Sequence, residues 1–268
     1  MGNKEVSRID LLIEAHIGLK RQGPGSSEMT IKALRFLDNI DKIARVADLG
    51  CGSGGQTMVL AAHIHGKIIG VDLFQGFIDA FNDNAEKLNL QDRVTGIVGS
   101  MENLPFQDEE FDLIWSEGAI DNIGFEKGLT YWRKFLRING YVAVTCPSWL
   151  TDKHPAEIEK FWMEAGSGLD TVGHNIDAMQ RAGYSFVAAF TLPEDCWTDN
   201  YFVPREAAEQ LLSEKYAGGK TVEAYIKGDK YEVELFSKYR QHYGYVFYIG
   251  KKRRGNARQK GTDYAGGA

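Results

Sequence analysis

The stretch Arg45–Thr57, RVADLGCGSGGQT, decides the fold class of this chain. An apolar run reaches the acidic residue Asp48 and then breaks into a loop that contains four glycines before Gln56. A second apolar run, Lys67–Asp72, again ends on a carboxylate. A strand, a glycine-rich turn, a helix and a strand with an acidic tip are typical of half of a nucleotide-binding site. The glycines let the backbone turn sharply and approach an anionic ligand at a helix N-terminus.

The composition is that of a packed, water-soluble protein. The chain has 268 residues, of which 43% are hydrophobic, and a formal net charge of -6. A negative charge disfavours nucleic-acid partners, which require a basic surface. The three cysteines, Cys51, Cys146 and Cys196, are isolated, and the histidines form no ligand pair with a carboxylate, so we expect neither disulfides nor a metal site. Without a signal peptide or a long apolar run, we expect a cytoplasmic protein that does not bind membranes.

Apolar runs and helical patterns alternate along the chain, which predicts an α/β fold with parallel strand pairing. We expect a doubly wound, Rossmann-like sheet of seven mostly parallel strands, with an antiparallel last strand and helical cap elements. The expected strands are 45–49, 67–72, 94–98, 111–116, 141–146, 184–192 and 243–250. The expected helices are 56–63, 76–88, 128–136, 156–164, 170–182, 206–215 and about 222–239, after N-terminal helices.

These elements predict a single domain over residues 1–250. We expect N-terminal helices within 5–40, a nucleotide-binding core over 44–146, and cap or substrate segments at 147–183 and 193–242. The sequence KKRRGNARQK begins a basic segment, 251–268, which predicts a disordered tail; the alternative is a weak contact with an anionic surface.

The glycine loop alone does not exclude a dinucleotide, because Gly50, Gly52 and Gly55 also satisfy GxGxxG. Asp48 argues against it, since a carboxylate at this strand end would repel a pyrophosphate. The same carboxylate could orient the loop or contact the ammonium of an amino-acid moiety. Two further segments also argue against a dinucleotide. They are 100–106, SMENLPF, and the strand 111–116, which delivers polar groups at its C-terminal end.

Several segments, taken together and in order, resemble class I S-adenosylmethionine-dependent methyltransferases. They are DxGxGxG from Asp48, GVD at 70–72, SMENLPF at 100–106, FDLIWSEGAI at 111–120 and LRINGY at 136–141. The similarity is closest to the small-molecule branch that includes ubiquinone- and menaquinone-type C-methyltransferases. It covers about residues 44–146 and implies S-adenosyl-L-methionine as the cofactor.

The resemblance implies a role for each residue of the glycine loop. Asp48, Gly50 and Gly52 would line the methionine part of the cofactor, while Cys51 and Gln56 would supply loop contacts. The alternative for Cys51 is a small packed residue, and no histidine at a recognisable spacing would activate it as a nucleophile.

The resemblance also implies contacts from the following strands. Asp72 would accept hydrogen bonds from both ribose hydroxyls, although it could instead cap the next helix. Leu73 would flank the adenine, and Ser100 and Met101 would contact its edge, unless Met101 belongs to the core. Glu117 would lie beneath the methionine group, near the transferred methyl.

A sulfonium methyl is already activated, so in-line proximity and orientation can carry most of the catalysis. A general base is required only if the acceptor arrives protonated. Asp121 is our candidate for that base, and the alternative is an aspartate that caps a helix or loop. His154 and His174 could reach the same face, or they could be surface or packing residues.

Specificity is expected outside the core. The loop Arg21–Gly25 could close over the cofactor, with Arg21 near its carboxylate. The segment Pro193–Phe202 is rich in aromatic and polar residues, so Trp197 and Tyr201 are candidate substrate contacts. Packing of this insertion on the sheet explains the same composition equally well.

The sequence therefore predicts a methyltransferase that acts on a small-molecule acceptor. The alternatives are methylation of a nucleic acid or protein, a cofactor-binding protein without transferase activity, and an NAD-dependent oxidoreductase. The acceptor atom and the oligomeric state, including a homodimer, stay open.

Overall fold

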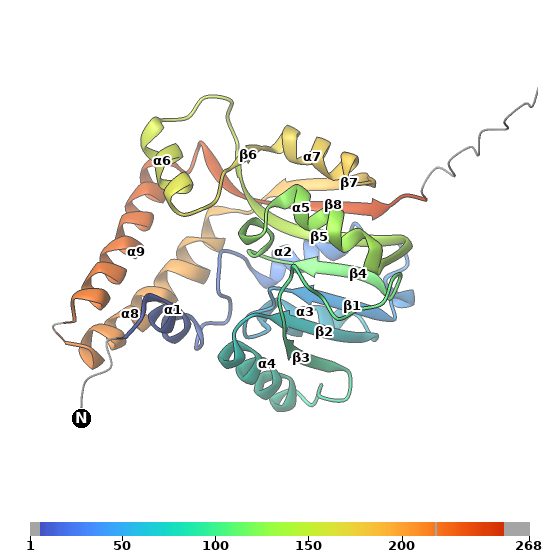
Figure 1. Ribbon diagram of the computed structural model, residues 1–268, viewed down its shortest axis with the longest axis horizontal. Helices are drawn as coiled ribbons and strands as arrows, with labels where there is room; N and C mark the ends of the chain where they lie inside the picture. Colours follow the sequence, from blue (N-terminus) through green and yellow to red (C-terminus); the bar gives the residue numbers. More distant parts are fainter. Residues whose placement is uncertain (1–5, 218, 255–268) are drawn as a thin grey trace, which may run out of the picture.

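A mainly parallel sheet forms the centre of the molecule in the computed structural model, which describes residues 6–217 and 219–254 (Figure 1). Within these residues the strand order is β3-β2-β1-β4-β5-β8-β7, with the short β6 beside β5. The strands are β1 (Arg45–Leu49), β2 (Lys67–Asp72), β3 (Val94–Val98), β4 (Phe111–Ser116), β5 (Leu136–Trp149), β6 (Asp170–Thr171), β7 (Tyr184–Thr191) and β8 (Tyr243–Lys252). The predicted doubly wound α/β fold is confirmed, and the two-residue β6 is an additional strand.

Alternating side chains along the strands build one apolar core on each face of the sheet. In β1, Val46 packs in the core with helices α2, α3 and α4, whereas its neighbour Ala47 packs in the core with α5 and α7. The helices that cover the sheet are α2 (Ser27–Leu34), α3 (Gly55–His63), α4 (Gln75–Lys87), α5 (Phe125–Trp132) and α7 (Val172–Arg181). This two-sided coverage leaves the carboxyl ends of the parallel strands free to build a site.

A helical cap, formed by α8 (Val203–Lys215) and α9 (Lys220–Tyr239), extends from the sheet on the side where α1 (Arg8–His16) lies (Figure 1). Leu11 and Ala15 of α1 share a small core with Leu212 and Val222 of the cap. The cap thereby holds the N-terminal helix against the molecule. A further helix, α6 (Ala156–Glu164), follows β5.

β8 lies inside the sheet, between β5 and β7, and runs antiparallel to both. It continues to Lys252, so the first two residues of the predicted tail belong to a strand. Lys252 is buried, and its ammonium is satisfied there because it donates to the carbonyl of Leu136 and lies 3.2 Å from a carboxylate oxygen of Glu109. Residues 255–268 of the predicted tail lie outside the described residues.

The helix predicted over 128–136 is displaced toward the N-terminus, because α5 spans Phe125–Trp132 and β5 already begins at Leu136. Gly124, with φ at 89°, directly precedes the helix and sets its start. Leu136 pairs with Phe111 of β4, which requires extended backbone at that position. The first two residues of the helix predicted over 170–182 instead form the strand β6, which pairs with β5, so α7 begins two residues later, at Val172.

We expect Gly70→Ala in β2 to lower the free energy of unfolding by about 1–3 kcal/mol through overpacking. A Cβ at this position would lie 2.5 Å from Cε2 of Phe81 and 2.8 Å from Sγ of Cys51. Gly228→Ala in α9 is the matched control, because nothing lies within 4 Å of its added Cβ. It should raise stability by about 0.5–1 kcal/mol. Urea denaturation measures both, and equal effects of the two substitutions would contradict the prediction.

Candidate functional site

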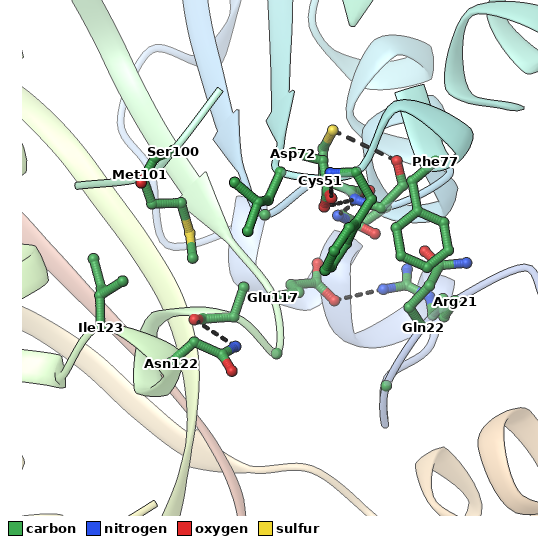
Figure 2. A pocket seen from close by; sticks show the side chains of 18 of the residues that line it. Arg21, Gln22, Cys51, Asp72, Phe77, Ser100, Met101, Glu117, Asn122 and Ile123 are labelled. Carbon is green, nitrogen blue, oxygen red and sulfur yellow. Dashed lines mark hydrogen bonds and ion pairs between the residues drawn. The ribbon is translucent and has the colours of Figure 1, made fainter. Parts of the chain in front are cut away.

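A cavity of about 490 Å³ lies at the carboxyl ends of β1, β2 and β4 (Figure 2). The glycine loop after β1 forms its floor, and residues 21–24, between α1 and α2, form part of its wall. We call these four residues the strap. The helix α1 adds Ile9 and Leu12 to the wall. The site therefore combines the sheet ends with a segment from the N-terminal region.

Close approach between chain segments explains the glycines of the loop. Gly50 has φ at 72°, and a Cβ there would lie 2.3 Å from Cβ of Ala119. A Cβ at Gly52 would lie 2.0 Å from Oε1 of Gln22 in the strap. Any larger residue at these positions would push the strap or the chain after β4 out of the cavity wall.

Gln22 fastens the strap to the glycine loop. Its Nε2 donates to Oγ of Ser53 over 2.8 Å and to the carbonyl of Leu19 over 3.1 Å. In return, the backbone N–H of Ser53 donates to Oε1 of Gln22 over 3.0 Å. The amide thus satisfies donors and acceptors on both segments at once.

Arg21 of the strap and Glu117 form a buried ion pair, with 2.5 Å between Nη1 and Oε2. Glu117 also accepts from Thr30 Oγ1 over 2.7 Å and from Trp115 Nε1 over 2.8 Å. The second guanidinium nitrogen of Arg21 donates to Thr30. Three donors therefore satisfy Glu117, and one of them, Arg21, ties the strap to the end of β4 (Figure 2).

Asp72 ends β2 at the edge of the cavity and is nearly buried. Its two carboxylate oxygens accept from the backbone N–H groups of Gly52, at 2.9 Å, and Phe74, at 3.1 Å. Burial raises the pKa of Asp72, and these hydrogen bonds oppose the shift. Asp72 thereby orders the glycine loop and the residue before α4, but it does not cap that helix, whose N-terminus has no side-chain cap.

Asp48 is fully buried beneath the cavity and does not line it. Its Oδ2 accepts from Thr57 Oγ1 over 2.5 Å and from Gln56 Nε2 over 3.1 Å, while Oδ1 has no partner. Burial raises the pKa of Asp48 to about 7. Of the two roles considered for this residue, the structure shows the one in which it orients the loop and α3.

Nine of the ten expected cofactor residues line this one cavity, and Asp48 is the exception. Leu73 is exposed at its edge, and the side chain of Met101 points into it, whereas the Met101 carbonyl accepts from Trp132. Cys51 is fully buried, and burial raises its thiol pKa, as suits a packed residue. The nine residues are Gly50, Cys51, Gly52, Gln56, Asp72, Leu73, Ser100, Met101 and Glu117.

Asp121 lies outside the first cavity and lines a second one of about 380 Å³. Its Oδ2 accepts from Ser167 Oγ over 3.1 Å, and its buried Oδ1 has no partner. His174 lines the same second cavity, 3.5 Å from Asp170. His154 does not, because its ring stacks on Trp149 with 3.5 Å between centroids.

Trp197 and Tyr201 line neither of these cavities, so the structure does not place them as substrate contacts. Trp197 is buried and stacks on Phe236 of α9, with ring centroids 4.5 Å apart. The hydroxyl of Tyr201 lies 3.2 Å from Nε2 of His16 and accepts from Arg205. Packing of the cap therefore explains the aromatic composition of this segment.

Several lining residues have no signature in the sequence. Ile9 and Leu12 come from an ordinary amphipathic helix, and Asn122 and Ile123 follow β4 without a recognisable motif. The sequence pointed to a closing loop at 21–25, whereas the role of Gln22 depends on a contact 31 residues away. Such contacts cannot be read from local patterns.

Residues 6–217 and 219–254 contain neither a metal-binding cluster nor a membrane-spanning helix. No group of three or more histidine, cysteine or acidic side chains is arranged to hold a metal ion. No helix in the same part of the chain has the length and apolarity needed to cross a membrane.

Comparison with known proteins gives a consistent picture. A family model described as a methyltransferase domain matches residues 46–140. Tocopherol O-methyltransferase of Arabidopsis thaliana is 34% identical over 93 residues, which are 33% of this chain and 27% of that protein. Demethylmenaquinone methyltransferase of Symbiobacterium thermophilum is 31% identical over 80 residues, 29% of this chain and 32% of the relative. The chain thus matches about a third or less of the length of these relatives.

One solved structure extends the similarity in fold to nearly the whole chain. A methyltransferase from Geobacter sulfurreducens, solved with S-adenosylhomocysteine, has a TM-score of 0.78 and 22% identity. The alignment covers 93% of this chain and 99% of that protein. The fold similarity therefore extends well beyond residues 46–140.

The buried carboxyl of Asp48 should make stability depend on pH. Its pKa is about 7 in the folded protein and 3.8 as the ordinary value, so the folded state retains a proton that the unfolded chain loses. The free energy of unfolding should therefore fall as the pH rises from about 4 to about 7. Asp48→Asn should lose this part of the slope in urea titrations at several pH values. Parallel curves for the two proteins would refute the assignment.

Proposed function

We propose that this chain methylates a small-molecule acceptor. The premise is that it carries a class I S-adenosylmethionine-dependent methyltransferase domain, which its sequence predicts and the matched domain and fold confirm. The observation that carries the proposal is the cavity at the carboxyl ends of β1, β2 and β4, which brings nine of the expected cofactor residues together. The matched relatives, named for tocopherol and demethylmenaquinone, support a small acceptor.

The cavity suits S-adenosylmethionine in its chemistry. Asp72 offers an acceptor-only side chain for ribose hydroxyls at the end of β2. The positive φ of Gly50 and Gly52 brings bare backbone to the cavity floor, where a larger side chain would fill the space. Leu12 and Phe77 add apolar surface to the wall.

When bound, the sulfonium supplies an activated methyl group that an in-line nucleophile can take. We propose that the protein contributes mainly proximity, orientation and exclusion of water. The strap performs the last task, because Gln22 and Arg21 hold it over the glycine loop. We also propose that residues 1–250 act as one domain, since α1 contributes to the cavity wall and packs on α8 and α9.

Calorimetric titration with S-adenosylmethionine, S-adenosylhomocysteine and NAD tests the proposal, and Asp72→Ala tests its geometry. We expect micromolar binding of both sulfur nucleotides and none of NAD. Loss of the ribose acceptor in Asp72→Ala should weaken their binding by about 1.5–3 kcal/mol. Asp79→Ala, on the exposed side of α4, is the matched control. Binding of NAD alone would reject the proposal. Unchanged affinity in Asp72→Ala would reject the contact between Asp72 and the ribose.

Because Gln22 fastens the strap to the glycine loop, we expect Gln22→Ala to change the rate at which the ligand dissociates. Losing its hydrogen bonds to Ser53 and Leu19 should loosen the cavity wall, and the affinity for S-adenosylhomocysteine should fall by about 1–2 kcal/mol. Most of the loss should appear as faster dissociation in stopped-flow measurements. Gln210→Ala, on the exposed surface of α8, should leave the dissociation rate unchanged. An unaltered rate in Gln22→Ala would show that the strap does not retain the ligand.

A further inference from the structure

The helix α1 packs on the cap with one face and forms part of the wall of the first cavity with another. Ile9 and Leu12 line that cavity, whereas Leu11 and Ala15 share the small core with α8 and α9. Figure 1 shows α1 beside α8. Any movement of α1 against the cap therefore moves part of the cavity wall.

A directed chain of hydrogen bonds joins α1 to a buried arginine of the cap. Burial lowers the pKa of His16, which favours the neutral ring. Its Nδ1 lies 2.8 Å from the carbonyl of Leu12, which can only accept, so Nδ1 carries the proton. Nε2 then accepts from the hydroxyl of Tyr201 over 3.2 Å, and that oxygen accepts from Nη1 of Arg205 over 3.0 Å. The carbonyl of His16 also accepts from Gln22 over 3.2 Å, so the same residue holds the strap.

Arg205 is in contact with more negative charge than it can neutralise. Its guanidinium lies 2.6 Å from Glu232, 3.2 Å from Glu209 and 3.8 Å from Asp229. Within residues 6–217 and 219–254, no other cation forms an ion pair with these three carboxyl groups. Arg205 and Glu209 are buried, and the side chains of Asp229 and Glu232 are only 19% exposed. Because carboxylates that share a buried site cannot all ionise, one of the three should keep its proton.

The geometry points to Glu209 and Asp229 as the pair that shares this proton. Oε1 of Glu209 and Oδ2 of Asp229 lie beside the same Nε of Arg205, and both are buried without a hydrogen-bond partner. Two ionised carboxylates can only accept, whereas one proton between them gives both oxygens a hydrogen bond. Burial raises the pKa of Glu209 to about 8, a hydrogen bond with Asp229 and the charge of that residue add to the shift, and the charge of Arg205 opposes it. The other titratable or charged groups around the pair are Glu206 on α8, Tyr225, Lys230, Glu232 and Glu234 on α9, Tyr201 before α8, and His16 on α1.

We propose that the proton shared by Glu209 and Asp229 keeps α1 closed over the first cavity, and that its loss in alkaline solution lets a bound ligand leave faster. Asp229 is partly exposed, so the proton can pass to water. Two facing carboxylates then repel each other and push α8 and α9 apart at this point. The hydrogen bond from Arg205 to Tyr201 is lost, and α1 loses its polar tie to the cap. The inference rests on the proposed function, because the ligand is S-adenosylhomocysteine.

The rate at which S-adenosylhomocysteine dissociates, measured by stopped flow against excess S-adenosylmethionine between about pH 7 and about pH 9, tests the inference. In the wild-type protein we expect the rate to rise several-fold, with a midpoint near pH 8. The amide in Glu209→Gln cannot ionise and can donate to Asp229, so the rate should keep its neutral value throughout. Tyr201→Phe lacks the tie to His16 and should release the ligand fast at every pH.

Two further variants isolate the shared proton. Asp229→Asn removes the same proton and serves if Glu209→Gln does not fold. Glu214→Gln, on the exposed surface of α8, is the matched control and should keep the pH dependence of the wild type. The pKa of Asp48 is also raised, to about 7, but this carboxyl remains in every variant and cannot produce a difference between them.

A measurement without ligand separates this inference from the proposed function. Hydrogen exchange of residues 8–16, compared between the wild type and Glu209→Gln at the same alkaline pH, should be faster in the wild type. Equal exchange in the two proteins, or dissociation rates with the same pH dependence, would overturn the inference. Failure to bind S-adenosylhomocysteine, with hydrogen exchange as expected, would instead reject the proposed function.

Discussion

The crossing of residues 20–22 over the glycine loop is the constraint on which the site depends. A Cβ at Gly55 would lie 1.7 Å from the carbonyl oxygen of Lys20, and one at Gly52 would overlap Gln22. The two segments can touch only because the loop lacks side chains at these positions. The glycines therefore serve two purposes, since they open the cavity floor and admit the strap that borders it.

Buried carboxylates order the parts of the site around that crossing. Asp48 holds the first turn of α3, Asp72 holds the glycine loop, and Glu117 holds the strap through Arg21. Each accepts hydrogen bonds from neighbouring donors of the protein itself, which fixes the cavity before any ligand arrives. Such preorganisation lowers the ordering cost of binding.

The sequence predicted the nucleotide-binding half well because its signals are local. Strand ends, glycines and the acidic tip of Asp72 follow from short patterns, and the structure places them together at one edge. Composition left two alternatives open at Trp197, because dense aromatic residues look alike whether they contact a ligand or pack under a cap. The pairing of Arg21 with Glu117 joins residues 96 positions apart, so no local pattern reports it. Asp121 could be placed near the site but not assigned to a separate cavity.

The position of β8 has a consequence for how the molecule is made. This strand is the last described element in the chain, yet it lies between β5 and β7. The sheet from β3 to β5 is complete in sequence by Trp149, so it can assemble on the ribosome while β7 still lacks its neighbour. β7 can join the sheet only after residues 243–252 have emerged, and the exposed edge of β5 must be kept from pairing with other chains until then.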